Sequence, residues 1–234
     1  MLVADRSIEV HLSTPTVLPT IAILGGTGHE GPGLALRWAH AGYQVFIGSR
    51  QKEKAEATAA EINQTLGTQN VIGQDNETAA HEADISVLTV MHAAHQSALE
   101  SVKDALQGKI LVDATARVDF PTAKPPPPPS AGRIAQDILG TGVRVVAAFQ
   151  NTPARLLKKN LGKPIASDVL VCSDDVEAAQ IVIQLAQEIG MQAFYAGGLD
   201  NAIVVEGITA MLIHINKHYG AHSASISVSG LPKP

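Results

Sequence analysis

Residues 21–50 read IAILGGTGHEGPGLALRWAHAGYQVFIGSR. An apolar strand at 21–24 enters a glycine turn, Gly26-x-Gly28-x-x-Gly31. The turn opens a helix at 31–41, and a second strand follows at 44–47. This order of strand, glycine turn, helix and strand is typical of the first βαβ unit of a dinucleotide-binding domain. The stretch therefore predicts both a fold class and a class of cofactor.

The glycine turn predicts a site for a diphosphate. Gly26 would permit the tight turn, Gly28 would let the diphosphate approach the backbone, and Gly31 would let the helix pack on the strand. The free amide groups at the helix N-terminus would then bind the anion. The alternative, a glycine turn without a ligand, is disfavoured because the turn lies between a strand and a helix as the motif requires.

The end of the second strand distinguishes NADP from NAD. In an NAD site, an acid about 20 residues after the turn binds the ribose 2′-hydroxyl. This chain has Ser49 and Arg50 there, with Lys54 one helical turn later. These groups favour a 2′-phosphate, so NADP is the expected cofactor. The alternative is that Arg50 and Lys54 form only a solvated basic start of the next helix. Cations at a helix N-terminus interact unfavourably with the helix dipole, which argues against this alternative.

Apolar strands alternate with helices along the rest of the chain. Further strands are expected at 70–73, 85–89, 110–113 and 143–148, and helices at 52–66, 78–82, 96–106 and 131–139. Continuous apolar strands that alternate with helices indicate a parallel sheet covered on both faces. We therefore predict an α/β fold with a doubly wound Rossmann-type parallel sheet over residues 19–150, after an N-terminal extension at 1–18.

A small C-terminal α/β region, residues 151–234, is expected to bind the substrate and support dimerisation. Strands are predicted at 169–172 and 193–195 around a helix at 175–189, with Asp174 as its N-cap. Asp174 and Asp175 are interpreted as a capping pair rather than a catalytic dyad. A last, strongly apolar helix is expected at 201–219, followed by a possible terminal strand at 224–229.

Composition excludes several classes of function. The net charge is −5 with no basic block, which argues against nucleic acid as a partner. No apolar run reaches the roughly 18–20 residues of a membrane span, and no signal-peptide pattern opens the chain, so a cytoplasmic protein is expected. Charged residues are only 17%, which suggests buried oligomer surface. The single cysteine, Cys172, lies in an apolar run and is interpreted as a buried structural thiol.

Histidines and prolines offer weaker patterns. His214, His218 and His222 are spaced by four, but no acid completes a known metal pattern, so no metal is expected. His92 and His95 follow the fourth strand, either as a proton donor or ring contact, or as ordinary loop and helix residues. The five prolines at 125–129 are interpreted as a stiff loop rather than as a ligand for an SH3-type domain.

The region around the turn resembles the NADPH-dependent coenzyme F420 reductases. The matching motifs are Gly25-Gly26-Thr27-Gly28-x-x-Gly31, Gly33-Leu34-Ala35-Leu36-Arg37 and Gly48-Ser49-Arg50 with Glu53-Lys54-Ala55-Glu56, and further matches lie at 84–89, 151–154, 171–175 and 196–201. The resemblance covers roughly residues 20–230. It implies a Rossmann-fold homodimer that moves a hydride between nicotinamide C4 and C5 of the deazaflavin coenzyme F420.

The resemblance also implies roles for individual residues. The expected cofactor contacts are Gly26, Thr27, Gly28, His29, Glu30, Gly31, Ser49, Arg50, Lys54, Thr89, Val90, Met91, Asn151 and Pro153, and the expected contacts of the deazaflavin are Thr152, Leu199 and Asn201. No catalytic side chain is expected, because the stacked rings carry the chemistry. The chain departs from the family pattern at Met91, at 115–118 and at Gly198, all on the side of the second substrate.

Two other functions fit the same cofactor site. One is an NADPH-dependent reductase of another flavin or of a small imine or carbonyl compound. The other, of a different class, is a non-catalytic sensor that binds NADP without turnover.

Overall fold

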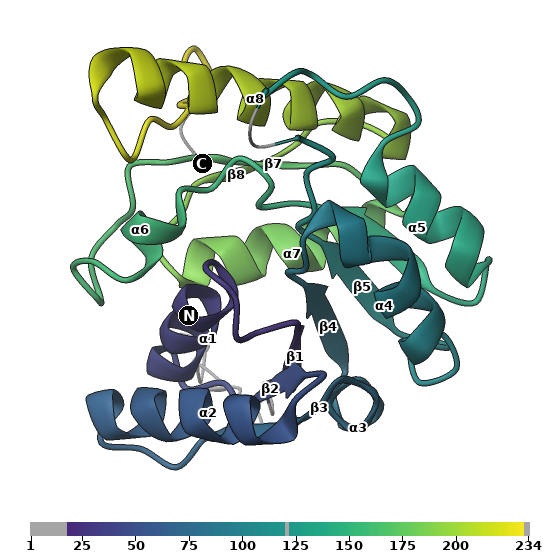
Figure 1. Ribbon diagram of the computed structural model, residues 1–234, viewed down its shortest axis with the longest axis vertical. Coiled ribbons are helices and arrows are strands. Elements are labelled where there is room, and N and C mark those ends of the chain that lie inside the picture. Colours follow the sequence, from purple (N-terminus) through teal and green to yellow (C-terminus); the bar gives the residue numbers. More distant parts are fainter. Residues whose placement is uncertain (1–17, 120–121, 232–234) are drawn as a thin grey trace, which may run out of the picture.

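Six parallel strands form the central sheet in the order β3-β2-β1-β4-β5-β6 (Figure 1). The computed structural model describes residues 18–119 and 122–231, so the predicted extension lies almost entirely outside the described residues. The strands are β1 Ile21–Leu24, β2 Val45–Ser49, β3 Val71–Asp75, β4 Ile85–Leu88, β5 Ile110–Asp113 and β6 Arg144–Ala147. Ile21 pairs with Val45 on one side and Ile85 on the other. The predicted doubly wound Rossmann-type sheet is confirmed.

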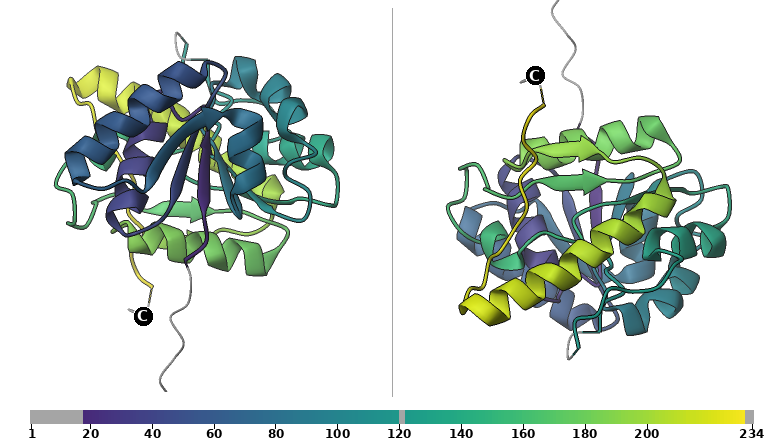
Figure 2. Two further views of the ribbon diagram at one scale, coloured as in Figure 1. Left: turned by 90° about the horizontal axis from the view of Figure 1, so that it is seen from below. Right: turned by 90° about the horizontal axis from the view of Figure 1, so that it is seen from above.

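Helices cover both faces of this sheet, which explains why its central strands are apolar throughout (Figure 2). One face carries α1 Gly31–His40, α2 Lys52–Leu66 and α7 Val176–Glu188, and the other carries α3 Asn76–Glu82, α4 His95–Val102 and α5 Ala131–Leu139. In β1, Ile21 and Ile23 belong to the first core, while Ala22 and Leu24 belong to the second.

The C-terminal region adds a short strand pair and a long helix. Strands β7 Val169–Val171 and β8 Ala193–Tyr195 are parallel to each other, and Cys172 bridges antiparallel to Ala147 at the end of β6. Helix α8 Ala202–Tyr219 runs across the loops that follow β5 and β6 (Figures 1 and 2). Thr209 of α8 donates a hydrogen bond to the carbonyl of Gln150 at 3.0 Å, which ties the helix to the loop after β6.

Three local predictions were wrong. The N-cap of α7 is Asp175, which accepts a hydrogen bond from Ala178 N at 2.9 Å, rather than Asp174. Helix α4 ends at Val102, four residues before the predicted end. Residues 224–229 are not a strand, although Asp168 N donates to the Ile226 carbonyl at 3.0 Å.

Three short elements escaped prediction because a single turn has no usable periodicity. They are α6 Ala154–Leu157 and the 3₁₀ turns His92–Ala94 and Leu199–Asn201. The proline run is a loop, as predicted, and Arg117 donates to the carbonyl of Pro127 at 2.8 Å. In the part of the chain that the structure describes, no helix is both long enough and apolar enough to cross a bilayer.

Candidate functional site

The glycine turn packs so closely on its surroundings that side chains are excluded. Gly25 has φ +70°, and a Cβ there would lie 2.5 Å from Cγ1 of Val90. A Cβ on Gly31 would lie 2.6 Å from the Cα of Gly26. Gly25 therefore has the left-handed backbone conformation of the turn. A Cβ at Gly26 would lie 2.6 Å from the Ile23 carbonyl oxygen, so Gly26 is needed for the turn to pack closely on β1.

The same turn leaves room for an anion. A Cβ on Gly28 would meet nothing closer than the Gly25 carbonyl oxygen at 3.6 Å. Asn76 Oδ1 accepts a hydrogen bond from Gly25 N at 3.0 Å and holds the start of the turn. Within residues 18–119 and 122–231, the backbone N–H groups of Thr27 and His29 make no hydrogen bond. These free donors at a helix N-terminus fit a diphosphate.

A cleft of about 1000 Å³ runs beside the turn along the carboxyl edge of the sheet. It contains eight of the predicted cofactor residues, namely Thr27, Gly28, Ser49, Arg50, Lys54, Thr89, Val90 and Met91. The rest of its lining is Gly25, Gln51, Asn76, Ala93, Ala94, Ser97, Ala98 and Ser101. Gly26, His29, Glu30 and Gly31 belong to the turn but do not line the cleft.

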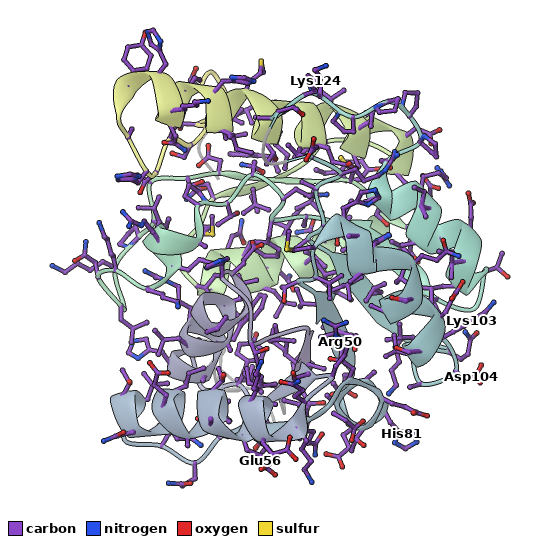
Figure 3. The ribbon with its side chains drawn as sticks, viewed as in Figure 1. Arg50, Glu56, His81, Lys103, Asp104 and Lys124 are labelled. Atoms are coloured by element: carbon purple, nitrogen blue, oxygen red, sulfur yellow. The ribbon has the colours of Figure 1, made fainter. Side chains whose placement is uncertain are left out.

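One end of the cleft is cationic. Arg50 follows β2 directly (Figure 3). Lys54 lies in the first turn of α2, and both residues line the cleft. Among the described residues, neither side chain has an ion-pair partner within 4.0 Å. Ser49 beside them is buried, and its Oγ accepts from Gln51 N at 3.2 Å. Two unpaired cations and a hydroxyl fit a 2′-phosphate.

A second polar group lies across the turn from this cationic end. Glu30, Gly33 and Arg37 share one side of α1, where a Cβ on Gly33 would lie 2.7 Å from Cβ of Leu157. Arg37 Nε donates to the Leu157 carbonyl at 2.8 Å on the same side. This side of α1 therefore faces α6. The Cβ position of Gly33 is also 3.6 Å from the carbonyl oxygen of Ala154, at the start of α6. Because Glu30 lies one turn earlier on this side of α1, we infer that it faces the loop at 150–153 that precedes α6.

Several side-chain atoms of this region lack hydrogen-bond partners, although Asn151 Nδ2 donates to the Asp168 carbonyl at 3.0 Å. The amide O and N of Gln150, Oδ1 of Asn151, Oγ1 of Thr152 and Oε1 of Glu30 are buried without a hydrogen bond. We call these four residues the polar cluster. Burial raises the pKa of the Glu30 carboxyl to about 8. Buried polar groups in native proteins nearly always have partners, so the cluster is suited to a bound ligand.

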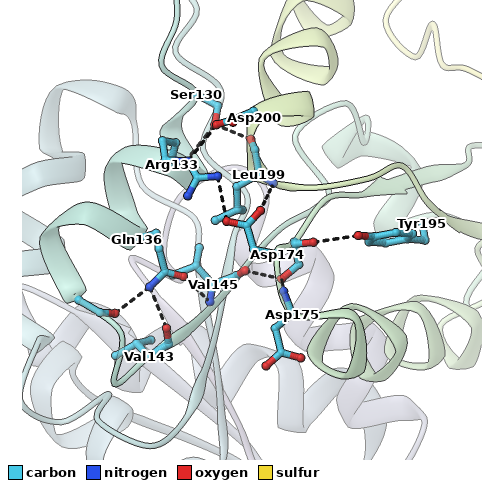
Figure 4. Close-up of polar contacts among 12 residues, drawn as sticks. Ser130, Arg133, Gln136, Val143, Val145, Asp174, Asp175, Tyr195, Leu199 and Asp200 are labelled. Atoms are coloured by element: carbon cyan, nitrogen blue, oxygen red, sulfur yellow. Dashed lines mark hydrogen bonds and ion pairs between the residues drawn. The ribbon is translucent and has the colours of Figure 1, made fainter.

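Leu199 and Asn201 lie elsewhere. The Leu199 side chain is 0% exposed in the core, and its backbone N donates to Asp174 Oδ1 at 3.0 Å. Arg133 holds this corner through Asp174 at 2.8 Å and Asp200 at 2.9 Å (Figure 4). Asn201 Nδ2 donates to the Ala196 carbonyl at 2.8 Å. Neither residue lines the cleft, and their contact with a second substrate stays a prediction.

The two histidines after β4 have different surroundings. His95 and Asp113 are both buried, with Nε2 and Oδ2 2.7 Å apart. His92 is exposed, and its pKa is lowered by partial burial and by the nearby positive charges of Arg117 and His95. A neutral His92 next to Met91 therefore remains available for a ring contact. No three His, Cys, Asp or Glu side chains of the described chain come together to hold a metal ion.

The segment at 115–118 is bound to α8. The backbone N of Arg117 donates to Glu206 Oε2 at 2.9 Å, and Ala131 N donates to Oε1 at 2.7 Å. Glu206 is fully buried, and burial raises its pKa while these two donors counteract the rise. The carboxylate therefore joins α8 to the start of α5 and to the loop after β5.

Several lining residues were not predicted. Asn76 follows the third strand, and the cleft wall opposite α2 consists of small side chains in and before α4, at 93, 94, 97, 98 and 101. Their helical spacing was visible in the sequence, but small residues at this spacing are also common in packed helix faces. Gln150 has no sequence feature that distinguishes it; only its unpartnered burial does.

This chain is similar to known F420-dependent NADP reductases. Residues 20–117 match the family model described as "NADP oxidoreductase coenzyme F420-dependent". The F420-dependent NADP reductase of Methanothermobacter marburgensis is 40% identical over 91% of this chain and 99% of its own length. The enzyme of the same name from Methanocaldococcus jannaschii is 39% identical over 90% and 98%.

A solved structure supports the same comparison. It is a protein of Arthrobacter sp. FB24, provisionally assigned as an F420-dependent NADP reductase. It superposes with a TM-score of 0.76 at 26% identity, covering 91% of this chain and 100% of its own.

Proposed function

Because this chain belongs to the family of F420-dependent NADP reductases, we infer that it transfers a hydride between NADP(H) and the deazaflavin coenzyme F420. The observation that carries this inference is the 40% identity with an archaeal reductase over 91% of the chain. The cleft with its unpaired Arg50 and Lys54 supports the NADP half of the reaction independently.

The cleft suggests how NADP would be held. Arg50, Lys54 and Ser49 bind the 2′-phosphate, and the free N–H groups of Thr27 and His29 bind the diphosphate. The small side chains in and before α4 that line the cleft leave room for the adenosine. Thr89, Val90 and Met91 lie on the far side of the turn, toward the ribose and nicotinamide.

The reacting rings would meet beside the loop after β6, past the end of the cleft at Thr89, Val90 and Met91. The polar cluster supports this position, because a ligand there would supply partners for Gln150, Asn151 and Thr152. Pro153 is the last residue of this loop before α6. The Leu199 side chain is buried in the core and the Asn201 amide donates to the Ala196 carbonyl, so neither contributes a polar group to the cleft. Hydride transfer needs ring contact and exclusion of water rather than an acid–base pair.

An absorbance assay of NADPH oxidation tests the proposed function. The enzyme is mixed with NADPH and F420, with NADPH and FMN, with NADPH and a small imine or carbonyl compound, and with NADPH alone. Turnover with F420 is expected. Turnover only with FMN or with a small imine or carbonyl compound would assign a different acceptor, and tight NADPH binding without turnover on any acceptor would identify a sensor.

We also propose a homodimer formed through α8. Val204, Met211, Ile215 and Tyr219 follow one another at intervals of seven, four and four residues along one side of the helix. They are 62%, 54%, 43% and 75% exposed, respectively. A stripe of large exposed apolar side chains on a long helix is a typical subunit interface. The substrate region at 151–234 would thus also carry the dimer contact.

Met211→Asp is expected to convert the dimer to a monomer, because a carboxylate in an apolar interface lacks a partner. Light scattering during size-exclusion chromatography measures the change. Ile72→Asp, at a 43% exposed site on the edge strand β3, is the matched control and should leave the mass unchanged. An unchanged mass for Met211→Asp would contradict the role of α8.

We propose that the protein works in the cytoplasm. Its single cysteine, Cys172, is a buried free thiol, which suits a reducing compartment.

A further inference from the structure

Glu30 is an acid inside the cofactor turn that the proposed function leaves unused; the residue is partly exposed, but its carboxyl oxygen Oε1 is buried. It lies between the two glycines of the turn that precede and begin α1, Gly28 and Gly31. Its carboxyl does not cap the helix, and Oε1 is buried without a partner. An acid at this position is unexpected, because the turn is suited to a dianionic diphosphate.

Topology places Glu30 on the nicotinamide side of the turn. The groups expected to bind the 2′-phosphate lie at β2, on one side of β1. The side of α1 that carries Glu30 packs, at Gly33, against the chain that follows β6, on the other side. A dinucleotide bound across the carboxyl ends of the strands extends over the turn from one side to the other. Its adenosine end at β2 leaves the nicotinamide on the side of the polar cluster.

Few charges reach this carboxyl. His29 is exposed beside it, and Arg37, two turns along α1, donates to five carbonyl oxygens. Helix α6 contributes only the exposed Arg155, the loop at 150–153 contributes no titratable group, and the first turns of α2 carry Lys52, Glu53, Lys54 and Glu56. None of these lies within 4.0 Å of Glu30 as an ion-pair partner in the described residues. Burial therefore governs its protonation.

We propose that Glu30 is a proton site linked to the redox state of the nicotinamide, protonated beside the neutral reduced ring and ionised beside the cationic oxidised ring. This inference rests on the proposed NADP site. In the free protein the pKa of about 8 keeps the carboxyl mostly neutral at pH 7. An opposite charge within about 4–6 Å lowers the pKa of a carboxyl by roughly 1–3 units. The diphosphate is common to both forms of the cofactor, so only the ring distinguishes them.

The proton balance of the reaction matches this behaviour. The C4–H bond of the dihydronicotinamide breaks, its electron pair forms a C–H bond on the acceptor, and the cofactor ring becomes a cation. The reduced deazaflavin takes up one proton at a ring nitrogen. Ionisation of Glu30 releases one proton as the nicotinamide charge appears, and solvent restores it after NADP⁺ leaves. The net charge beside the nicotinamide thus changes little during turnover.

Calorimetric titration with NADP⁺ and with NADPH at pH 7, in two buffers of different ionisation enthalpy, counts the protons released on binding. We expect NADP⁺ to release more protons than NADPH; lowering the Glu30 pKa from about 8 by roughly one unit makes the difference about 0.4 proton at pH 7. The 2′-phosphate is present in both cofactors, so its titration cancels in the difference. From pH 6 to pH 9, the affinity for NADP⁺ should rise about tenfold relative to that for NADPH.

Glu30→Gln keeps the shape of the side chain but cannot ionise, so it should remove both differences. Glu61→Gln, at an exposed site on α2, is the matched control and should keep them. Equal proton counts for the two cofactors in the unmodified protein, or a difference that survives Glu30→Gln, would overturn the proposal. Failure of the F420 assay would leave these titrations interpretable, whereas no binding of either cofactor would refute the NADP site itself.

Stability of the free protein gives a second measurement. A carboxyl whose folded pKa is raised binds its proton more tightly in the folded state than in the unfolded state. Its stabilising effect is complete below the unfolded value of 4.5 and is lost as the pH rises toward about 8. Urea unfolding should therefore show the stability of Glu30→Gln rising relative to the unmodified protein between pH 5 and pH 8. A parallel pH dependence of the two proteins would contradict burial of the charge.

Discussion

Replacing Arg50 with Asp is expected to weaken NADPH binding by about ten- to a hundredfold and to leave NADH binding nearly unchanged. Arg50 lines the cleft without an ion-pair partner among the described residues. A hydrogen bond from a cation to a phosphate contributes roughly 1.5–3 kcal/mol, and each 1.4 kcal/mol is about tenfold in affinity. The aspartate would also repel the 2′-phosphate, which NADH lacks. Fluorescence titration of the reduced cofactors measures both dissociation constants.

Lys103→Asp is the charge-matched control for this variant. Lys103 is exposed just after α4 (Figure 3) and is not among the residues that line the cleft. It changes the net charge equally, so a purely long-range effect would weaken NADPH as much as Arg50→Asp does. An equal loss for NADPH and NADH in Arg50→Asp would instead indicate a distorted cleft. Either result would refute the role that we assign to Arg50.

The central sheet was predictable because its strands are buried on both faces. In β1, Ile21, Ala22, Ile23 and Leu24 all reach a core, so the strand is a continuous apolar run between Pro19-Thr20 and a glycine turn. The cationic end of the cleft was predictable for a related reason. Arg50 comes directly after β2, and the chain at the carboxyl end of such a strand has few alternative positions.

The part of the site beside the loop at 150–153 and before α8 depends on contacts between segments that are distant in the sequence. No local sequence pattern encodes such contacts. The inferred position of Glu30 beside the loop at 150–153 depends on Gly33 and Arg37, which dock α1 on α6. Leu199 matches the family by position, yet its side chain enters the core, since Asp174 and Ser130 bind its backbone N–H and carbonyl. Sequence position therefore located the segment before α8 but could not show which way its side chains point.

Arg37 shows how much of this arrangement depends on one buried cation, and Arg37→Met should destabilise the fold by about 3 kcal/mol or more. Its guanidinium is 3% exposed and donates to the carbonyls of Leu156, Leu157, Lys159, Lys163 and Ile189. Methionine fills similar space but leaves these acceptors without their donor. Each buried acceptor left unsatisfied costs roughly 1–3 kcal/mol, less where water enters.

Urea unfolding measures this change, with Arg155→Met as the matched control. Arg155 is an exposed arginine on α6, so its replacement should change the free energy of unfolding by less than about 0.5 kcal/mol. For a chain of this size, a loss of 3 kcal/mol corresponds to a fall of roughly 6–12 °C in Tm. Because the same carbonyls position the chain after the polar cluster, Arg37→Met should also abolish the difference in proton release between NADP⁺ and NADPH. A variant as stable as Arg155→Met would show that water or other donors replace the guanidinium, and that the docking of α1 on α6 does not depend on it.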